Sequence, residues 1–361
     1  MIKAASVLLT VFLCAAVAAV TTPTAVPLTS IPPATNTPSP TTTILPSPAP
    51  PRLAPFGVVN INKDEIEFDL DGDGRNVDSI AFWEAPDPTA SLMFVTSKGN
   101  ESIEVYQYPF QEQLRTLSCG EASNGVWVEQ ASAILYVTGR ESNQVCAYTL
   151  PDLSLDSAHS FKTAATRDWS EPNLALLTLP DGRKRIYVSY DEVVYYHDAE
   201  NGNSLGSFKP EKGLETMFAD DYYQALYIPD EGDRSGVYIY DKDGNRAGQT
   251  FGDRSIFDSD AEGIWVYKCF SREGSDNGEG LIVISDQKED QTDFEFFQRS
   301  SKAHLGTLTI DGVNNTDGIA ITQQASPAYP MGLLAVIDDD DSTVGVGWET
   351  IFEITGLSCG G

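Results

Sequence analysis

Carboxylate side chains recur where short apolar runs of the sequence begin or end. The segment 69–74, DLDGDG, places three carboxylates at alternating positions before a glycine. Such side chains can converge on one cation while the backbone turns sharply, and Ca²⁺ takes about six to eight oxygen ligands. Ile80 stands where an EF-hand carries its bidentate glutamate, which excludes the helix-loop-helix form. We expect a calcium loop of another kind, completed by Asp78, with an acidic surface turn as the alternative.

A second acidic pattern indicates a shared surface. Asp260 and Glu262 flank Ala261, and the alternation of side chains along a strand turns both carboxylates to one face, where they repel unless a cation lies between them. Further carboxylates at the ends of apolar runs are Glu215, Asp230, Glu231, Asp233, Asp317 and residues 338–341. Taken singly, each can be a solvated turn residue. Their repetition favours one shared acidic surface at the mouth of a channel, where calcium would bind.

Repeated hairpins must position these side chains. Each repeat has an apolar run rich in β-branched and aromatic residues, a polar turn and a second alternating run. The six copies begin at Leu92, Ile134, Arg185, Ala225, Gly280 and Gly332. Their spacing of about 40 to 55 residues is typical of four-stranded propeller blades.

The sequence therefore predicts an all-β fold, a six-bladed β-propeller. Residues 77–83 and 260–266 are expected as innermost strands that line a central channel, and a segment near 56–68 is expected to close the ring against the last blade. A pair of β-sandwiches is the alternative, which the regular period disfavours.

The first residues predict export. Residues 1–20 combine Lys3, an apolar run and a small-residue cleavage site, so they are expected to be a secretory signal peptide. An uncleaved membrane anchor is the alternative. Residues 21–55 are rich in Pro, Thr and Ser, which indicates a disordered linker before a folded domain at 56–361. We expect a secreted, extracellular protein.

Net charge excludes two classes of partner. The chain has 23 Lys and Arg against 53 Asp and Glu, a formal charge of -30. Such a chain repels nucleic acid and anionic membranes. We expect a monomer that binds a small molecule.

Cysteine usage agrees with an oxidising compartment. Cys14 leaves with the signal peptide, and four remain: Cys119, Cys146, Cys269 and Cys359. Three pairings are possible, of which chain proximity favours Cys119 with Cys146 and Cys269 with Cys359. A zinc site is disfavoured because no pair has CxxC spacing. Asn100 and Asn314 fit the N-glycosylation pattern.

Four segments, in order, resemble one known family. They are LETMFADD at 214–221, DAEGI at 260–264, NTDGI at 315–319 and YPMGL at 329–333. The chain is similar here to the β-propeller phytases, six-bladed calcium enzymes that remove phosphates from myo-inositol hexakisphosphate (phytate). The resemblance implies calcium-assisted hydrolysis of phosphomonoesters of the 3-phytase type.

The resemblance also implies roles for particular residues. It places calcium ligands or their neighbours at Asp78, Glu215, Asp230, Asp260, Glu262, Gln287 and Asp317. Lys98 and Arg140 resemble phosphate-binding residues of the family, and Glu192 falls where the family has an active-site glutamate. For Lys98 and Arg140, surface ion pairs are the alternative.

Three positions depart from the family pattern. Asp191 replaces a lysine, Asn173 a tyrosine and Gly139 an asparagine. These changes leave open a non-catalytic, calcium-stabilised propeller that binds a carbohydrate, a protein or a phosphorylated ligand. A propeller lactonase or esterase is a weaker alternative. The three histidines form no Ser/His/Asp arrangement, so nucleophilic catalysis is not expected.

Overall fold

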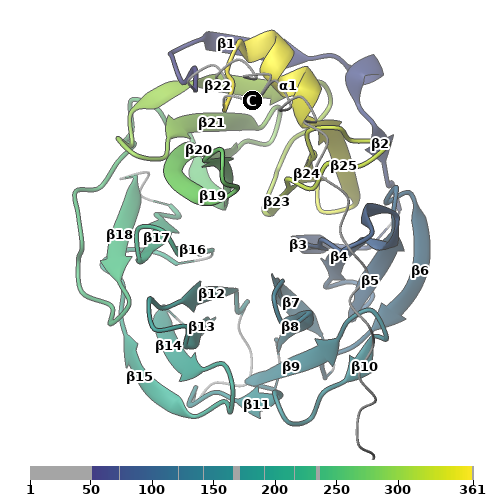
Figure 1. The fold of residues 1–361 in the computed structure, drawn as a ribbon, viewed down its shortest axis with the longest axis vertical. Coiled ribbons are helices and arrows are strands. Elements are labelled where there is room, and N and C mark those ends of the chain that lie inside the picture. Colours follow the sequence, from purple (N-terminus) through teal and green to yellow (C-terminus); the bar gives the residue numbers. More distant parts are fainter. Residues whose placement is uncertain are drawn as a thin grey trace, which may run out of the picture. The chain divides into compact units, whose positions relative to one another are not determined.

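The repeated hairpins fold into six sheets that form the blades of a ring (Figure 1). The structure, a computed structural model, describes residues 51–72, 74–120, 122–140, 142–165, 171–190, 192–214, 216–232 and 236–359. The predicted signal peptide and residues 21–50 of the predicted linker lie outside the described residues. The described part has the predicted fold, an all-β six-bladed propeller.

The first three blades follow the chain from the innermost strand outwards. Blade one contains β3 (Val77–Trp83), β4 (Leu92–Ser97), β5 (Ser102–Gln107) and β6 (Glu112–Leu117). Blade two contains β7 (Ser123–Glu129), β8 (Ile134–Gly139), β9 (Gln144–Thr149), β10 (Ser154–Leu155) and β11 (Phe161–Lys162). Blade three contains β12 (Leu174–Thr178), β13 (Lys184–Tyr190), β14 (Val193–Asp198) and β15 (Ser204–Phe208).

The last three blades are less uniform. Blade four contains β16 (Phe218–Asp220), β17 (Ala225–Pro229) and β18 (Val237–Asp241). Blade five contains β19 (Asp260–Phe270), β20 (Asp276–Gln287), β21 (Asp293–Gln298), β22 (His304–Ile310) and β1 (Gly57–Ile61). Blade six contains β23 (Ile319–Thr322), β24 (Leu333–Asp338), β25 (Ser342–Gly347) and β2 (Phe68–Asp69). The middle strands of all six blades confirm the six predicted hairpins.

Burial decreases from the channel outwards. Every residue of β3 is buried, whereas five of the six residues of β6 are exposed. An innermost strand has a neighbouring blade on each face, so both sets of alternating side chains are covered. The core consequently lies between blades; one such cluster joins Phe82 and Met93 of blade one to Leu333 of blade six.

The ring closes through the N-terminal segment. In β2, Phe68 pairs with Gly345 of β25, which confirms closure against the last blade. The segment also adds β1 to blade five, in parallel with β22, a contact that the sequence did not predict. Next to these strands, Arg52 and Ser358 exchange two backbone hydrogen bonds. Pairing of this kind covers strand edges that would otherwise be open to association.

Two disulfides pair as predicted. Cys119 joins Cys146, and Cys269 joins Cys359 across a sequence separation of 90. The second disulfide links β19 to the segment after α1 (Trp348–Thr355), a short helix that the sequence analysis missed. The other helical turns of the described residues are two 3-10 segments, Lys63–Glu65 and Pro88–Ala90. Among the described residues, no helix has the length and apolar character needed to cross a membrane.

The innermost strands of the six blades face the centre of the ring (Figure 1), and two different cavities lie at the two ends of this central channel. Residues at or near the starts of these strands, including Asp78, Gly263 and Asp317, line a cavity of about 30 Å³. Residues at or near their ends, including Glu84 and Lys268, line a cavity of about 370 Å³. The strands therefore run in the same direction. We call the first end the site mouth and the second the far mouth.

Candidate functional site

The close approach of blades one and six brings two predicted residues together at the site mouth. Asp78 lies in β3, and Asp317 precedes β23. Between them, Gly318 packs so closely on the backbone of Asp78 that a Cβ atom would overlap the Asp78 carbonyl oxygen. A glycine at this position therefore allows Asp317 to reach the carboxylate of Asp78.

Lys98 lies among three carboxylates. Its Nζ atom is 3.4 Å from Oδ2 of Asp78 and 3.8 Å from both Oε1 of Glu171 and Oδ2 of Asp317. Burial disfavours the ammonium, yet these carboxylates and Asp340 together raise the pKa of Lys98 above its usual range. Lys98 is thus a fixed positive charge inside an acidic cluster.

Asp317 has the most altered acidity in this cluster. Burial raises its pKa first, the charge of Asp78 raises it further, and Lys98 only partly opposes them, so the pKa reaches about 8. Asp340, which shares a hydrogen bond with Asp317, also has a raised pKa because it is buried. Without a further cation, this cluster favours retention of a proton at neutral pH.

Arg140 enters the same cluster from blade two. Its Nη2 atom donates to Oε1 of Glu171, the oxygen atom that also faces Lys98. The arrangement accounts for one departure from the family pattern: a Cβ at Gly139 would lie 2.6 Å from the carbonyl oxygen of Cys119. An asparagine would not fit here without movement of the disulfide-bonded segment.

Four further predicted ligands lie on or beside strands of blades four and five. Gln287 donates from Nε2 to Oδ1 of Asp317 at 2.5 Å, and it pairs in register with Asp260. Oδ1 of Asp260 accepts the N–H of Gly232, two residues after the fully buried Asp230. Glu262 is 4% exposed in β19. Glu215 and Asp191 lie outside the described residues.

Glu192 has a different environment. It stands in the turn between β13 and β14 and forms an ion pair with Lys209 at 2.5 Å, in which both side chains are 65% exposed. Its predicted neighbours Lys98 and Arg140 are mostly buried. The structure therefore places Glu192 on an exposed turn.

Asn124 is a site residue that sequence reasoning missed. It is 2% exposed at the start of β7 and donates from Nδ2 to Oδ1 of Asp78 at 3.3 Å. Its own Oδ1 atom is buried and accepts no hydrogen bond from the described residues. Its position near the start of an innermost strand, like that of Asp78, was the available signal. This orphaned oxygen is a ready ligand for a hard cation.

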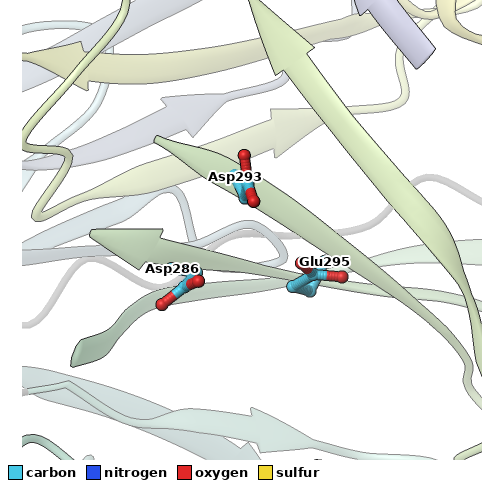
Figure 2. A group of neighbouring side chains, drawn as sticks. All are labelled: Asp286, Asp293 and Glu295. Carbon is cyan, nitrogen blue, oxygen red and sulfur yellow. The ribbon is translucent and has the colours of Figure 1, made fainter. Parts of the chain in front are cut away.

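A separate acidic group, distinct from the cluster around Lys98, lies in blade five (Figure 2). Asp286 is on β20, and Asp293 and Glu295 are on β21, with one oxygen of each within 4.8 Å of the others. Lys288 contacts Asp293 at 2.6 Å and Asp286 at 3.5 Å, and His304 lies 2.5 Å from Glu295. Positively charged or hydrogen-bonding side chains of the protein already compensate this cluster, and we assign it no metal.

Comparisons with known proteins support a phytase-like propeller. A family model described as Phytase matches residues 155–357. A 3-phytase from Bacillus subtilis (strain 168) is 26% identical over 207 residues, which are 52% of this chain and 52% of that protein. The matched part thus spans about half the length of this relative.

A solved structure of Kuenenia stuttgartiensis hydrazine synthase gives a TM-score of 0.47 with 14% identity, over 74% of this chain and 75% of that chain. The likeness is too low to bear on function.

The family match begins at residue 155. Blade one, with Asp78 and Lys98, and Arg140 of blade two therefore lie before the matched segment.

Proposed function

The chain belongs to the phytase family, and we propose that it is a secreted enzyme that hydrolyses phosphomonoesters of phytate with the help of calcium. One observation carries the proposal most: Lys98 and Arg140, from different blades, meet on Glu171 at the site mouth. Two cationic side chains that converge on one carboxylate oxygen can bind an anionic group. A phosphoryl group offers oxygen atoms of the same kind.

The donor set of the site mouth fits calcium. Asp78, Asp317 and Asn124 present carboxylate or amide oxygens, and one Asn124 oxygen is buried without a partner among the described residues. Asp230, Asp260, Glu262 and Gln287 add further oxygens on the neighbouring blades. Ca²⁺ prefers hard oxygen donors and accepts a variable number of them. When bound, calcium would supply charge neutralisation and activation of water.

The protein's own residues have separate tasks in this mechanism. Arg140 and Lys98 would exchange Glu171 for phosphoryl oxygens, which charge-assisted hydrogen bonds hold in place for attack by water. Asn124 and Gln287 would fix Asp78 and Asp317 through the hydrogen bonds described above. Since Glu192 is exposed, we propose that it contacts only the outer part of a bound substrate.

Phosphate release from calcium phytate tests the proposal. With the purified full chain, we expect release that stops when calcium is chelated. Asp260→Ala and Arg140→Ala are each expected to lower the rate by about 100-fold or more, because catalysis of this kind depends on positioned charge. Asp152→Ala, at an exposed turn of blade two, serves as the control and should retain the full rate.

The alternatives predict other outcomes of the same assay. Binding of phytate without phosphate release would assign the chain to the non-catalytic propellers. Turnover of lactones or esters without phosphatase activity would favour calcium-assisted ester chemistry.

The two disulfides support secretion, because such bonds persist in oxidising compartments. Detection of the mature chain in the culture medium, and its mass in solution, test secretion and the monomer.

A further inference from the structure

The channel is divided by three aromatic rings. The ring centroids of Trp127 and Trp265 lie 5.2 Å apart, and Phe218 lies 5.5 Å from the first and 5.4 Å from the second. Both tryptophans line the site mouth and the far mouth, and both are half-buried. The two mouths are therefore separate chambers that share one aromatic wall.

The far mouth is the larger chamber. Its volume of about 370 Å³ lies within the range of about 300 to 1,000 Å³ found for small-molecule sites. Trp127, Phe218 and Trp265 form its apolar wall. The charged groups of the lining are Glu84, Glu129, Asp221 and Lys268. Lys184 already pairs with Glu129 at 2.8 Å, so two carboxylates remain to face one ammonium, and neither an anion nor a cation is strongly selected.

Hydrogen bonds between blades fix the polar groups of this chamber. Oε1 of Glu84 accepts the N–H of Gln323 at 2.9 Å and the hydroxyl of Thr322 at 2.8 Å, which joins blades one and six. Gln323 in turn donates from Nε2 to the carbonyl oxygen of Lys268 at 2.7 Å, which reaches blade five.

The same pattern continues around the ring. Gln130 of blade two donates to the carbonyl oxygen of Phe82 at 2.7 Å, and Asp221 of blade four accepts the N–H of Thr178 at 2.8 Å. Burial raises the pKa of Asp221, which the nearby ammonium of Lys268 partly offsets. Because these groups are held before any ligand arrives, little ordering cost remains for binding.

Exposed apolar side chains extend the surface beyond the chamber. Tyr222 and Tyr223 lie in the turn after β16, Phe270 ends β19, and Met331 lies between β23 and β24. These turns follow first strands, so they belong to the face of the far mouth. Their exposures are 51%, 37%, 47% and 40%. The other exposed large apolar residues of the described chain are scattered on outer strands.

We propose that the far mouth is a second, non-catalytic site that binds a neutral carbohydrate chain. An aromatic wall covers the apolar face of a sugar ring, while fixed carboxylates and amides pair with its hydroxyl groups. The exposed apolar side chains beyond the chamber provide contacts for further sugar units. The site is independent of the phosphatase chemistry, because the aromatic wall separates it from Lys98 and Arg140.

Titration of the full chain with cellotetraose and mannotetraose tests the site. Tryptophan fluorescence and calorimetry should both report binding of at least one of them, with a Kd of about 1 mM or tighter. We expect Phe270→Ala and Lys268→Ala to weaken binding by at least about tenfold. Leu155→Ala, which also removes an exposed apolar side chain but on β10, is the matched control.

Two further measurements distinguish the site mouth from the far mouth. Asp260→Ala should leave sugar binding unchanged, and Phe270→Ala should leave phosphate release unchanged. The proposal is wrong if neither tetrasaccharide binds at about 10 mM. It is equally wrong if choline binds in their place, which would assign the chamber to organic cations, or if Asp260→Ala abolishes sugar binding.

Discussion

Lys98 Nζ lies 3.8 Å from Oδ2 of Asp317, although the two residues belong to the first and the last blade of the ring. These blades become neighbours only when the ring closes. The acidic cluster around Lys98 is therefore assembled by closure, and it depends on the pairing of β2 with β25.

Removal of the ammonium should destabilise the calcium-free protein. Lys98→Met leaves Asp78 and Asp317 without their cation, and we expect a loss of about 2 to 4 kcal/mol in the free energy of unfolding. Added calcium should restore more stability to this variant than to the native chain, because it replaces the lost charge. Denaturant unfolding with chelator and with calcium measures both quantities.

Lys209→Met provides the comparison for this experiment. Its ion pair with Glu192 is largely exposed, so the change should be below about 1 kcal/mol. Equal losses in the two lysine variants would contradict the assignment of Lys98 as the internal cation.

Stability should depend on pH through Asp317. In the unfolded chain this carboxyl titrates near 3.8, whereas in the calcium-free folded protein it retains its proton to about pH 8. The folded state binds the proton more tightly, so its contribution is complete below about pH 4 and is lost as the pH rises towards 8. With chelator present, the melting temperature of the native chain should fall between about pH 5 and pH 8.

Asp317→Asn removes the titrating group while retaining the shape of the side chain. Its melting temperature should fall less over the same interval. Identical pH slopes for both proteins would sink the idea that Asp317 is the responsible group.

The closing strand should contribute measurably to stability. Phe68 is 6% exposed and packs against Gly345, so Phe68→Ala is expected to cost about 3 to 5 kcal/mol. Thermal unfolding measures the loss. Val58→Ala, in β1 and 76% exposed, should change stability by less than about 0.5 kcal/mol. A Phe68 variant as stable as the Val58 variant would show that β2 is dispensable.

The two disulfides should differ in their contributions. Cys269–Cys359 closes a loop with a sequence separation of 90, against 27 for Cys119–Cys146. Loop entropy then predicts that replacing both cysteines of the longer loop by serine costs about 1 kcal/mol more than the same change in the shorter loop. Denaturant unfolding of the two double variants compares them, and the reverse order would contradict the loop-entropy account.

The blades were predictable from local pattern. In β4 and β5, for example, Leu92–Ser97 and Ser102–Gln107 alternate around a polar turn, and this alternation is enough to predict a hairpin. The disulfide pairing also followed from chain proximity. These features depend on residues that are close in sequence.

The contacts that close the ring and build the site were harder to predict. β1 pairs with β22, and Asn124 meets Asp78, through contacts between segments that no periodicity links. Likewise, Arg299 is fully buried between Asp220 and Asp276, yet its sequence surroundings resemble an ordinary charged turn. Such partners are chosen by the packing of one blade on the next rather than by local propensity.

The hydrogen-bonded pair Arg52 and Ser358 has a consequence for engineering. With the two ends of the described chain side by side, a short peptide could join them, and new ends could be opened in an exposed turn between blades. Such a circular permutant would retain all six sheets, and a linker attached to its new ends would leave the propeller from another blade. The propeller could then be mounted on a support in a chosen orientation, with either mouth facing the solution.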